Sequence, residues 1–213
     1  MASKKTEDPS LTPRKTPGQG RAVATVAAIL EAAARILETE GLAAYTTNAV
    51  AALAGVSIGS LYQYFPSKDA ITRALINREA EQLLEDVNSI EITNDPHAGL
   101  ELLIRAAVKH QFRRPGLARL LDVEEIRLPM SEDYVRMGRE IAKKFERCLA
   151  GTGMVARKDL ATTSRDLASI VKALVDAAGQ RGETNEPALV ARVRKAVFGY
   201  ILYSASQHEA GKR

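Results

Sequence analysis

The sequence has few of the features that secreted, membrane and metal-dependent proteins rely on. Its 213 residues include one cysteine, Cys148, so an intramolecular disulfide cannot form and the reducing cytoplasm is the expected location. No apolar run approaches the roughly 20 residues that a membrane-spanning helix needs. Behind the lysines of the N-terminus there is no apolar stretch, so we expect no secretory signal.

Catalytic patterns are also missing. The histidines, His97, His110 and His208, are scattered, and the sequence has neither a phosphate-binding glycine loop nor the spacing of a zinc site. Glu124 and Glu125 are neighbours in the sequence, and on a helix they would face different directions. We therefore expect no enzymatic activity, no metal and no cofactor.

Positive charge is unevenly distributed. The net charge is +4, but residues 1–86 contain nine Lys/Arg and ten Asp/Glu, so the whole surplus lies in the later part of the chain. From residue 41 to residue 68 there is no acidic residue at all. That stretch would not repel a phosphate backbone, although the chain as a whole gives only weak support for nucleic-acid binding.

Apolar periodicity predicts an all-α protein of about nine helices. With 46% hydrophobic and 26% charged residues, the composition is that of an ordinary globular protein. No segment shows the sustained alternation of a strand. The spacing of apolar residues and the breaks between them predict a helix from residue 23 to the stop at Gly41, two short helices within 46–65, and further helices at 68–87, at 97–113, after Pro115, and at 131–150, 159–180 and 186–208.

The breaks also predict three regions along the chain. Residues 1–20 mix proline, glycine, serine, threonine and charge, so we expect a flexible N-terminal arm. Residues 21–87 form a first helical domain, and residues 88–213 form a second, wholly helical domain after the break at residues 93–96.

Residues 46–65 have the pattern of a helix-turn-helix. Two short apolar patterns flank the turn Gly55-Val56-Ser57. Thr46 and Thr47 can cap the helix before the turn, and Ser57 can cap the helix after it. The small residues Ala51 and Gly55 would let the two helices cross closely, and Gly55 can adopt the left-handed turn conformation.

The second helix of this motif has a buried side and an outward side. Ile58, Leu61 and Phe65 have the spacing of a buried stripe, which leaves Gly59, Ser60, Tyr62, Gln63 and Tyr64 facing outward. Gln63 can form two hydrogen bonds with adenine, Ser60 can bond several bases, and Gly59 permits close approach. Thr46, Thr47, Tyr62, Tyr64 and Lys68 are suited to phosphate contacts, which position a protein without reading sequence, and Ser57 is a further candidate for contact with DNA. The alternative is a pair of packed helices with no contact to DNA.

Taken together, these residues resemble the signature of TetR/AcrR-type transcriptional regulators. The resemblance covers about residues 21–80 and rests on Thr46-Thr47, Ala51, Ala54-Gly55-Val56-Ser57, Gly59, Leu61-Tyr62, Tyr64-Phe65 and Ser67-Lys68. It implies an N-terminal three-helix DNA-binding domain and a C-terminal domain for effector binding and dimerisation. The implied function is a cytoplasmic homodimer that binds a palindromic operator on double-stranded DNA, usually represses, and is released by a small molecule.

Two positions depart from the family pattern. Asn48 stands where the family often has a basic residue, so a phosphate contact is not expected there. Ile58 replaces a position that is often polar, and it could contact a thymine methyl group instead of the core. An activator, or a member that acts without a ligand, remains the alternative function.

Dimerisation would use the last two long helices, at about 159–180 and 186–208. Each has an apolar stripe, and two copies together could form a four-helix bundle. The alternative is that both stripes complete the core of one chain. The stripes consist of Leu167, Ile170, Val171, Leu174, Val175 and Ala178, and of Val190, Val193, Val197, Ile201 and Leu202.

An effector pocket is expected among the helices between about 97 and 150, and the N-terminal arm could add contacts to DNA. The candidate pocket residues are Arg105, His110, Phe112, Met130, Tyr134 and Met137. Cations of the arm could touch phosphates or the minor groove, or the arm could simply be solvated. These cations are Lys4, Lys5, Arg14, Lys15 and Arg21.

Overall fold

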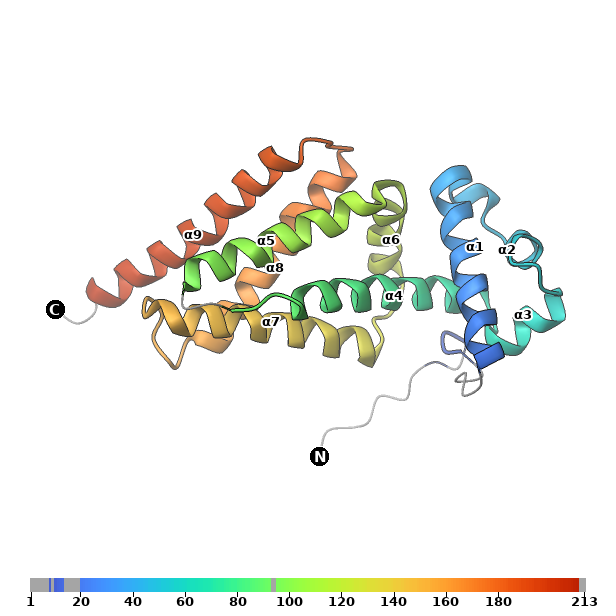
Figure 1. Ribbon diagram of the computed structural model, residues 1–213, viewed down its shortest axis with the longest axis horizontal. Coiled ribbons are helices and arrows are strands. Elements are labelled where there is room, and N and C mark those ends of the chain that lie inside the picture. Colours follow the sequence, from blue (N-terminus) through green and yellow to red (C-terminus); the bar gives the residue numbers. More distant parts are fainter. Residues whose placement is uncertain (1–7, 9, 14–19, 93–94, 211–213) are drawn as a thin grey trace, which may run out of the picture. The chain divides into compact units, whose positions relative to one another are not determined.

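The computed structural model describes residues 8, 10–13, 20–92 and 95–210, and within them it contains nine helices and no strand (Figure 1). The all-α prediction is therefore confirmed. No helix among the described residues is both long and apolar enough to cross a bilayer. The helices are α1 (Gly20–Ala44), α2 (Thr47–Leu53), α3 (Ile58–Tyr64), α4 (Lys68–Asn88), α5 (Pro96–Arg113), α6 (Pro115–Arg127), α7 (Glu132–Thr152), α8 (Leu160–Gln180) and α9 (Glu186–Ala210).

Local sequence signals explain most helix boundaries. The carboxylate of Asp95 accepts hydrogen bonds from the backbone N–H groups of His97 and Ala98, so α5 begins one residue before the predicted start. Within the range of α1 the backbone of Gly41 is not helical, with φ +76°, and a short second helical stretch follows it to Ala44. The predicted stop at Gly41 is therefore confirmed, since a residue with this conformation interrupts the helix.

The chain divides into two compact units that alternate along the sequence. Unit 1 comprises residues 1–79 and 116–134, and unit 2 comprises residues 80–115 and 135–213. These units differ from the expected domains 21–87 and 88–213, because most of α6 and the segment after it belong to unit 1. Helices α4 and α7 each have residues in both units.

The core of unit 1 holds the helix-turn-helix in place. Helix α1 packs against α2, and α2 packs against α3. Leu61 and Phe65 are fully buried in one cluster with Ile71 and Leu75 of α4 and with Leu117 of α6. Burying each such side chain contributes about 1.5–3 kcal/mol. The short helix α3, which has seven residues, depends on this packing because isolated helices of that length are unstable.

A short N-terminal segment also packs on unit 1. Leu11 is 8% exposed and belongs to the same core cluster. The Ser67 hydroxyl donates a hydrogen bond of 2.7 Å to the carbonyl oxygen of Ser10, and it accepts one of 3.1 Å from the Ala70 backbone N–H. Residues 10–13, which we expected in a flexible arm, are thus attached to the start of α4.

Unit 2 is built from α5, α8 and α9, which pack against one another, together with α7 (Figure 1). The two apolar stripes expected at a dimer surface lie mainly in this core. Their buried members are Leu167, Val171, Val175, Ala178, Val190, Val193, Val197 and Ile201. Ile170 and Leu174 are half-buried, and Leu202 is 59% exposed. The assignment of whole stripes to a dimer surface was therefore wrong, because α5 supplies a third helix that covers them within one chain.

Candidate nucleic-acid interface

Two hydroxyl caps and one glycine shape the helix-turn-helix. Thr46 accepts a hydrogen bond of 3.1 Å from the Ala49 backbone N–H and begins α2. Ser57 accepts one of 3.0 Å from the Ser60 backbone N–H and begins α3. Between them Gly55 has φ +68°, a conformation that costs a side chain about 1 kcal/mol or more. The sequence signals for this turn are confirmed.

Where α2 and α3 cross, the expected small residues are present, but the first residue of α3 is not buried as predicted. Ala51 is 3% exposed, and Leu61 and Phe65 are fully buried. Ile58, which we expected in the buried stripe, is 39% exposed. As the first residue of α3 it lies beyond the cluster, so this part of the prediction was wrong, and its side chain is available to a partner.

The outward side of α3 presents a glycine, a tyrosine and a glutamine. Gly59, Tyr62 and Gln63 are exposed. The hydroxyls of Tyr62 and Thr47 are 3.1 Å apart and share a hydrogen bond, so α2 fixes the tyrosine ring. Thr47 therefore supports Tyr62, whereas only Thr46 caps α2.

Ser60 and Tyr64 are less available than their positions suggested. Both are half-buried, and the aromatic ring of Tyr64 packs against the core of unit 1. The Ser60 hydroxyl is 2.8 Å from the Ser57 hydroxyl and is hydrogen-bonded to it. To contact a base, Ser60 would have to give up that bond or share it.

Lys68 is exposed at the first position of α4 and lies over an aromatic ring. Its Nζ is 5.5 Å from the ring centroid of Tyr45, within the range of a cation–π contact. Tyr45 is 2% exposed, and its hydroxyl is 3.1 Å from that of Thr72. Burial raises the pKa of Tyr45, so the ring stays neutral and supports the lysine. Nothing in the sequence identified Tyr45, since the contact depends on tertiary packing.

The neighbouring carboxylate, Asp69, is paired with an arginine from α6. Arg127 donates two hydrogen bonds to Asp69, of 2.6 and 3.0 Å, and two to Glu124, of 2.5 and 2.9 Å. The hydrogen bonds from Arg127 lower the pKa of Asp69. This pairing offsets a negative charge beside Lys68 that would otherwise repel phosphate. The sequence did not reveal it because the partners are 58 residues apart.

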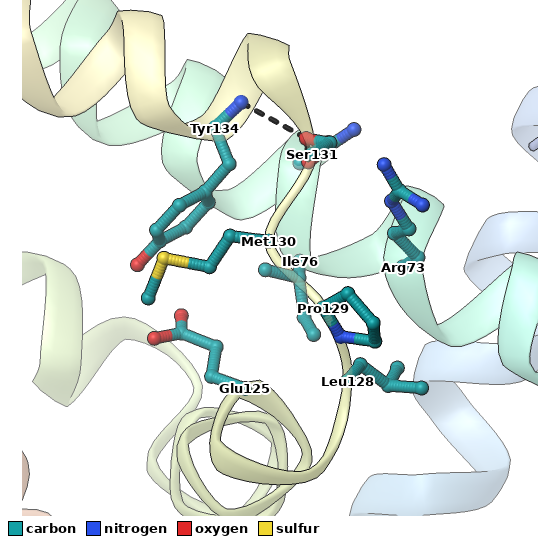
Figure 2. Close-up of a pocket in the computed structure, with 9 residues that line it drawn as sticks. Arg73, Ile76, Glu125, Leu128, Pro129, Met130, Ser131 and Tyr134 are labelled. Carbon is teal, nitrogen blue, oxygen red and sulfur yellow. Dashed lines mark hydrogen bonds between the residues drawn. The ribbon is translucent and has the colours of Figure 1, made fainter. Parts of the chain in front are cut away.

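Two of the expected effector residues line a pocket within unit 1 (Figure 2). Met130 and Tyr134 lie there beside Glu125, and the Ser131 hydroxyl accepts a hydrogen bond from the Tyr134 backbone N–H. Arg73, which is 6% exposed, lies on the α4 side of the pocket. The pocket has room for about one water molecule, which is too little for a drug-sized ligand.

The other four expected effector residues belong to unit 2 and do not line this pocket. Arg105 is exposed and forms an ion pair of 2.8 Å with Glu101. His110 and Phe112 are half-buried, and Met137 is 3% exposed. The six expected effector residues are thus divided between the two units.

The side chains of the N-terminal cations lie outside the part of the chain that the structure describes. Lys4, Lys5, Arg14 and Lys15 lie outside the described residues, and Arg21 is described only in its backbone. Among the described residues there is no group of His, Cys, Asp and Glu side chains suited to hold a metal ion.

Two family profiles match the chain. Residues 29–75 match "Bacterial regulatory proteins, tetR family", and residues 95–201 match "Tetracyclin repressor-like, C-terminal domain". The second match alone spans half of the sequence.

Similar proteins include curated sequences and solved structures. A nucleoid occlusion factor SlmA from Aliivibrio fischeri is 39% identical over 95 residues, which are 44% of this chain and 48% of that protein. The chain thus spans about half the length of such relatives. A TetR transcription regulator from Haloarcula marismortui has a TM-score of 0.67 at 21% identity, over 84% of this chain and 97% of that one. The fatty acid degradation regulator FadR from Bacillus halodurans gives 0.64 at 19%, over 81% and 97%. At these identities the structures show a shared fold.

Proposed function

Because the chain belongs to the TetR family of bacterial regulatory proteins, we propose that it is a homodimeric repressor that binds a palindromic operator and is released by a small molecule. DNA-binding regulation follows from the family. Repression, the symmetry of the operator and release by an effector are the proposed parts.

The observation that carries the proposal is the exposed side of α3. Gly59, Tyr62 and Gln63 are exposed there, and no carboxylate occurs between residues 41 and 68. A helix with such a surface can enter the major groove of DNA. The exposed amide of Gln63 could meet base edges in the groove, and the Tyr62 hydroxyl could meet phosphates.

We assign base reading to Gln63 and backbone contacts to the residues around it. An exposed amide can bond adenine at two atoms, and it is the group on α3 best suited to discriminate bases. Tyr62, held by Thr47, and Lys68, held over Tyr45, present a hydroxyl and an ammonium group for phosphates. Secondary contacts are assigned to Thr46, Ser57, Gly59, Ser60 and Tyr64.

Substitutions separate these roles. With oligonucleotides selected by the protein, Gln63→Ala should relax base preference, since a two-bond contact is worth about 1–3 kcal/mol of discrimination. Lys68→Ala should weaken binding to all sequences alike and lower the salt slope by about one. Gln82→Ala, a change of an exposed glutamine on α4, serves as the control. An unchanged base preference after Gln63→Ala would remove the assignment of base reading to α3.

Dimerisation is proposed through the faces of α8 and α9 that the core of unit 2 leaves exposed. On α9, Leu202 and Tyr203 are 59% and 69% exposed, and Gly199 is exposed beside them. On α8, Ser169 and Ala173 are exposed and small, so a second helix could approach closely. Large apolar side chains on an exposed face favour a protein interface over a solvated one.

Release requires an effector that binds the DNA-incompetent arrangement better than the competent one. We place the effector in unit 2, among helices that include α5 and α7, and His110, Phe112 and Met137 remain its candidate contacts. Because α4 has residues in both units, it is the proposed path from the effector to α3. By linkage, an effector that lowers DNA affinity must itself bind less tightly in the presence of DNA.

A role in nucleoid occlusion is the second candidate, favoured by the 39% identity with proteins of that name. Fluorescence microscopy of a strain that lacks the gene distinguishes the candidates. Division septa placed across nucleoids would support occlusion. Normal septa together with altered transcription near the bound sites would support the regulator.

A further inference from the structure

The net positive charge of the chain lies in unit 2, and the helix-turn-helix does not use it. Residues 80–115 and 135–213 contain nineteen Lys/Arg and fourteen Asp/Glu, a net charge of +5, whereas the rest of the chain has a net charge of −1. A charge excess of this kind attracts polyanions. The excess of positive charge therefore favours a polyanion-binding surface on unit 2 rather than on unit 1.

Helix α7 concentrates part of this charge on one exposed face. Arg139, Lys143 and Arg147 are exposed and four residues apart, and Arg136 lies on the same side one turn earlier. At 1.5 Å per residue the four cations form a line about 16 Å long. The opposite side of α7 is buried: Phe145, Cys148 and Leu149 belong to the core of unit 2, and Met137 is 3% exposed.

One carboxylate lies within this line and does not neutralise it. Glu140 accepts a hydrogen bond of 2.7 Å from Lys143, and both side chains are more than 40% exposed. The hydrogen bond and the charge of Lys143, followed by the charges of Arg147 and Arg136, lower the pKa of Glu140. An exposed pair of this kind is weak. Between Arg136 and Arg147 the exposed face carries four cations and Glu140, and Glu146 beside it is half-buried. Two exposed carboxylates, Glu132 and Asp133, lie one turn before Arg136, so the excess of positive charge rests on Arg139, Lys143 and Arg147.

The chemistry of the face favours nucleic acid over a membrane or a protein. A helix that binds a bilayer surface needs a free apolar side, and the apolar side of α7 is already packed in unit 2. A protein interface usually needs buried aromatic or aliphatic anchors, which the cationic line does not contain. Guanidinium groups pair with phosphates at two atoms, and three of the four cations are arginines.

We propose that the exposed face of α7, formed by Arg136, Arg139, Lys143 and Arg147, is a second, sequence-independent contact for the phosphate backbone of double-stranded nucleic acid. It acts separately from α3, so the inference does not depend on the operator or on the dimer. Its consequence is that one chain has two nucleic-acid contacts, one that reads bases and one that binds any duplex.

The test measures binding of the full chain to a 30-base-pair duplex of random sequence, by fluorescence anisotropy between 50 and 200 mM salt. The α7 variant carries Arg139→Gln, Lys143→Gln and Arg147→Gln. The control variant carries Lys109→Gln, Arg157→Gln and Lys158→Gln, which removes the same charge from other exposed positions of unit 2. Both are also made together with Gln63→Ala and Lys68→Ala, which weaken the contact through α3.

Loss of three phosphate contacts changes the salt dependence by a predictable amount. Between 50 and 200 mM salt, the affinity of the unmodified chain should fall about 40-fold more than that of the α7 variant. With α3 weakened, salt-dependent binding should persist in the control variant and disappear in the α7 variant. If the α7 and control variants have the same affinities and the same slopes, the proposal is wrong.

Two control measurements accompany the binding test, one for folding and one for binding to lipid. Thermal unfolding checks that each variant folds; should the triple change fail, Lys143→Gln with Arg147→Gln should still reduce the salt effect by about 12-fold. Vesicles with anionic lipid replace the duplex in the second measurement. Binding to vesicles but not to the duplex, lost in the α7 variant, would overturn the assignment to nucleic acid.

Discussion

Replacing Arg127 by glutamine tests whether α6 stabilises the start of α4. The guanidinium group joins Asp69 of α4 to Glu124 of α6 through four hydrogen bonds. Removing it leaves Glu124, whose side chain is 11% exposed, without this partner. Losing one partner of a buried pair costs about 3–5 kcal/mol, whereas an exposed pair contributes about 1 kcal/mol or less.

The expected cost of Arg127→Gln lies between these limits. The side chains of Arg127 and Asp69 are 48% and 33% exposed, so water can partly replace the lost contacts. We expect a loss of about 1–3 kcal/mol, which lowers the Tm of a chain of this size by about 3–10 °C. Arg35→Gln, which removes an exposed cation from α1, is the matched control and should leave the Tm within about 1–2 °C of its value.

The effect of Arg127→Gln on the Tm should also depend on pH. Because the folded-state pKa of Asp69 is lowered, its pairing stabilises the fold above the unfolded-state pKa of about 3.9, and this stability is lost as the pH falls through the folded-state pKa. The difference in Tm between the unmodified chain and its Arg127→Gln variant should be constant above about pH 5 and should shrink below about pH 4. Thermal unfolding followed by circular dichroism measures it. Equal Tm values at pH 7, or a difference that does not change with acidity, would refute the role of the pairing.

Two further predictions concern the packing of α5 on α7. Gly99→Ala should destabilise the chain by about 1–3 kcal/mol, because a Cβ there would lie 2.8 Å from Sγ of Cys148. This loss of stability should be smaller in a chain that also carries Cys148→Ala, which lacks the sulfur atom. An equal loss with and without Cys148→Ala would exclude the clash. Burial raises the pKa of the Cys148 thiol, so a thiol reagent at pH 8 should react only as fast as the chain opens; rapid reaction in the absence of denaturant would contradict the buried position.

Local signals predicted most of the fold because each helix carries its own apolar period and its own start or stop. Ser57 caps α3, and Gly55 makes the turn before it, as their residue types suggested. Residues 10–13 show the limit of such signals. Their composition suggests flexibility, yet Leu11 is buried in a core formed by residues far along the chain.

The candidate site was predictable only where it is local. Gln63 and Tyr62 are exposed, as their positions on α3 suggested. The support for Lys68 and the pairing of Asp69 depend on residues distant in sequence, Tyr45 and Arg127. The apolar stripes of α8 and α9 gave no sign of which partner covers them, since a helix of the same chain and a helix of a second copy require the same pattern.

Sequencing of the genomic fragments retained by the full chain, and by its Gln63→Ala variant, tests whether α3 reads the bases of a palindromic operator. We expect the retained fragments to share an inverted repeat whose half-sites are about one DNA turn (~34 Å), or a multiple of it, apart. We also expect Gln63→Ala to weaken the base preference within each half-site. Fragments that share no sequence in excess of competitor DNA, or the same repeat retained equally well by Gln63→Ala, would contradict base reading by α3.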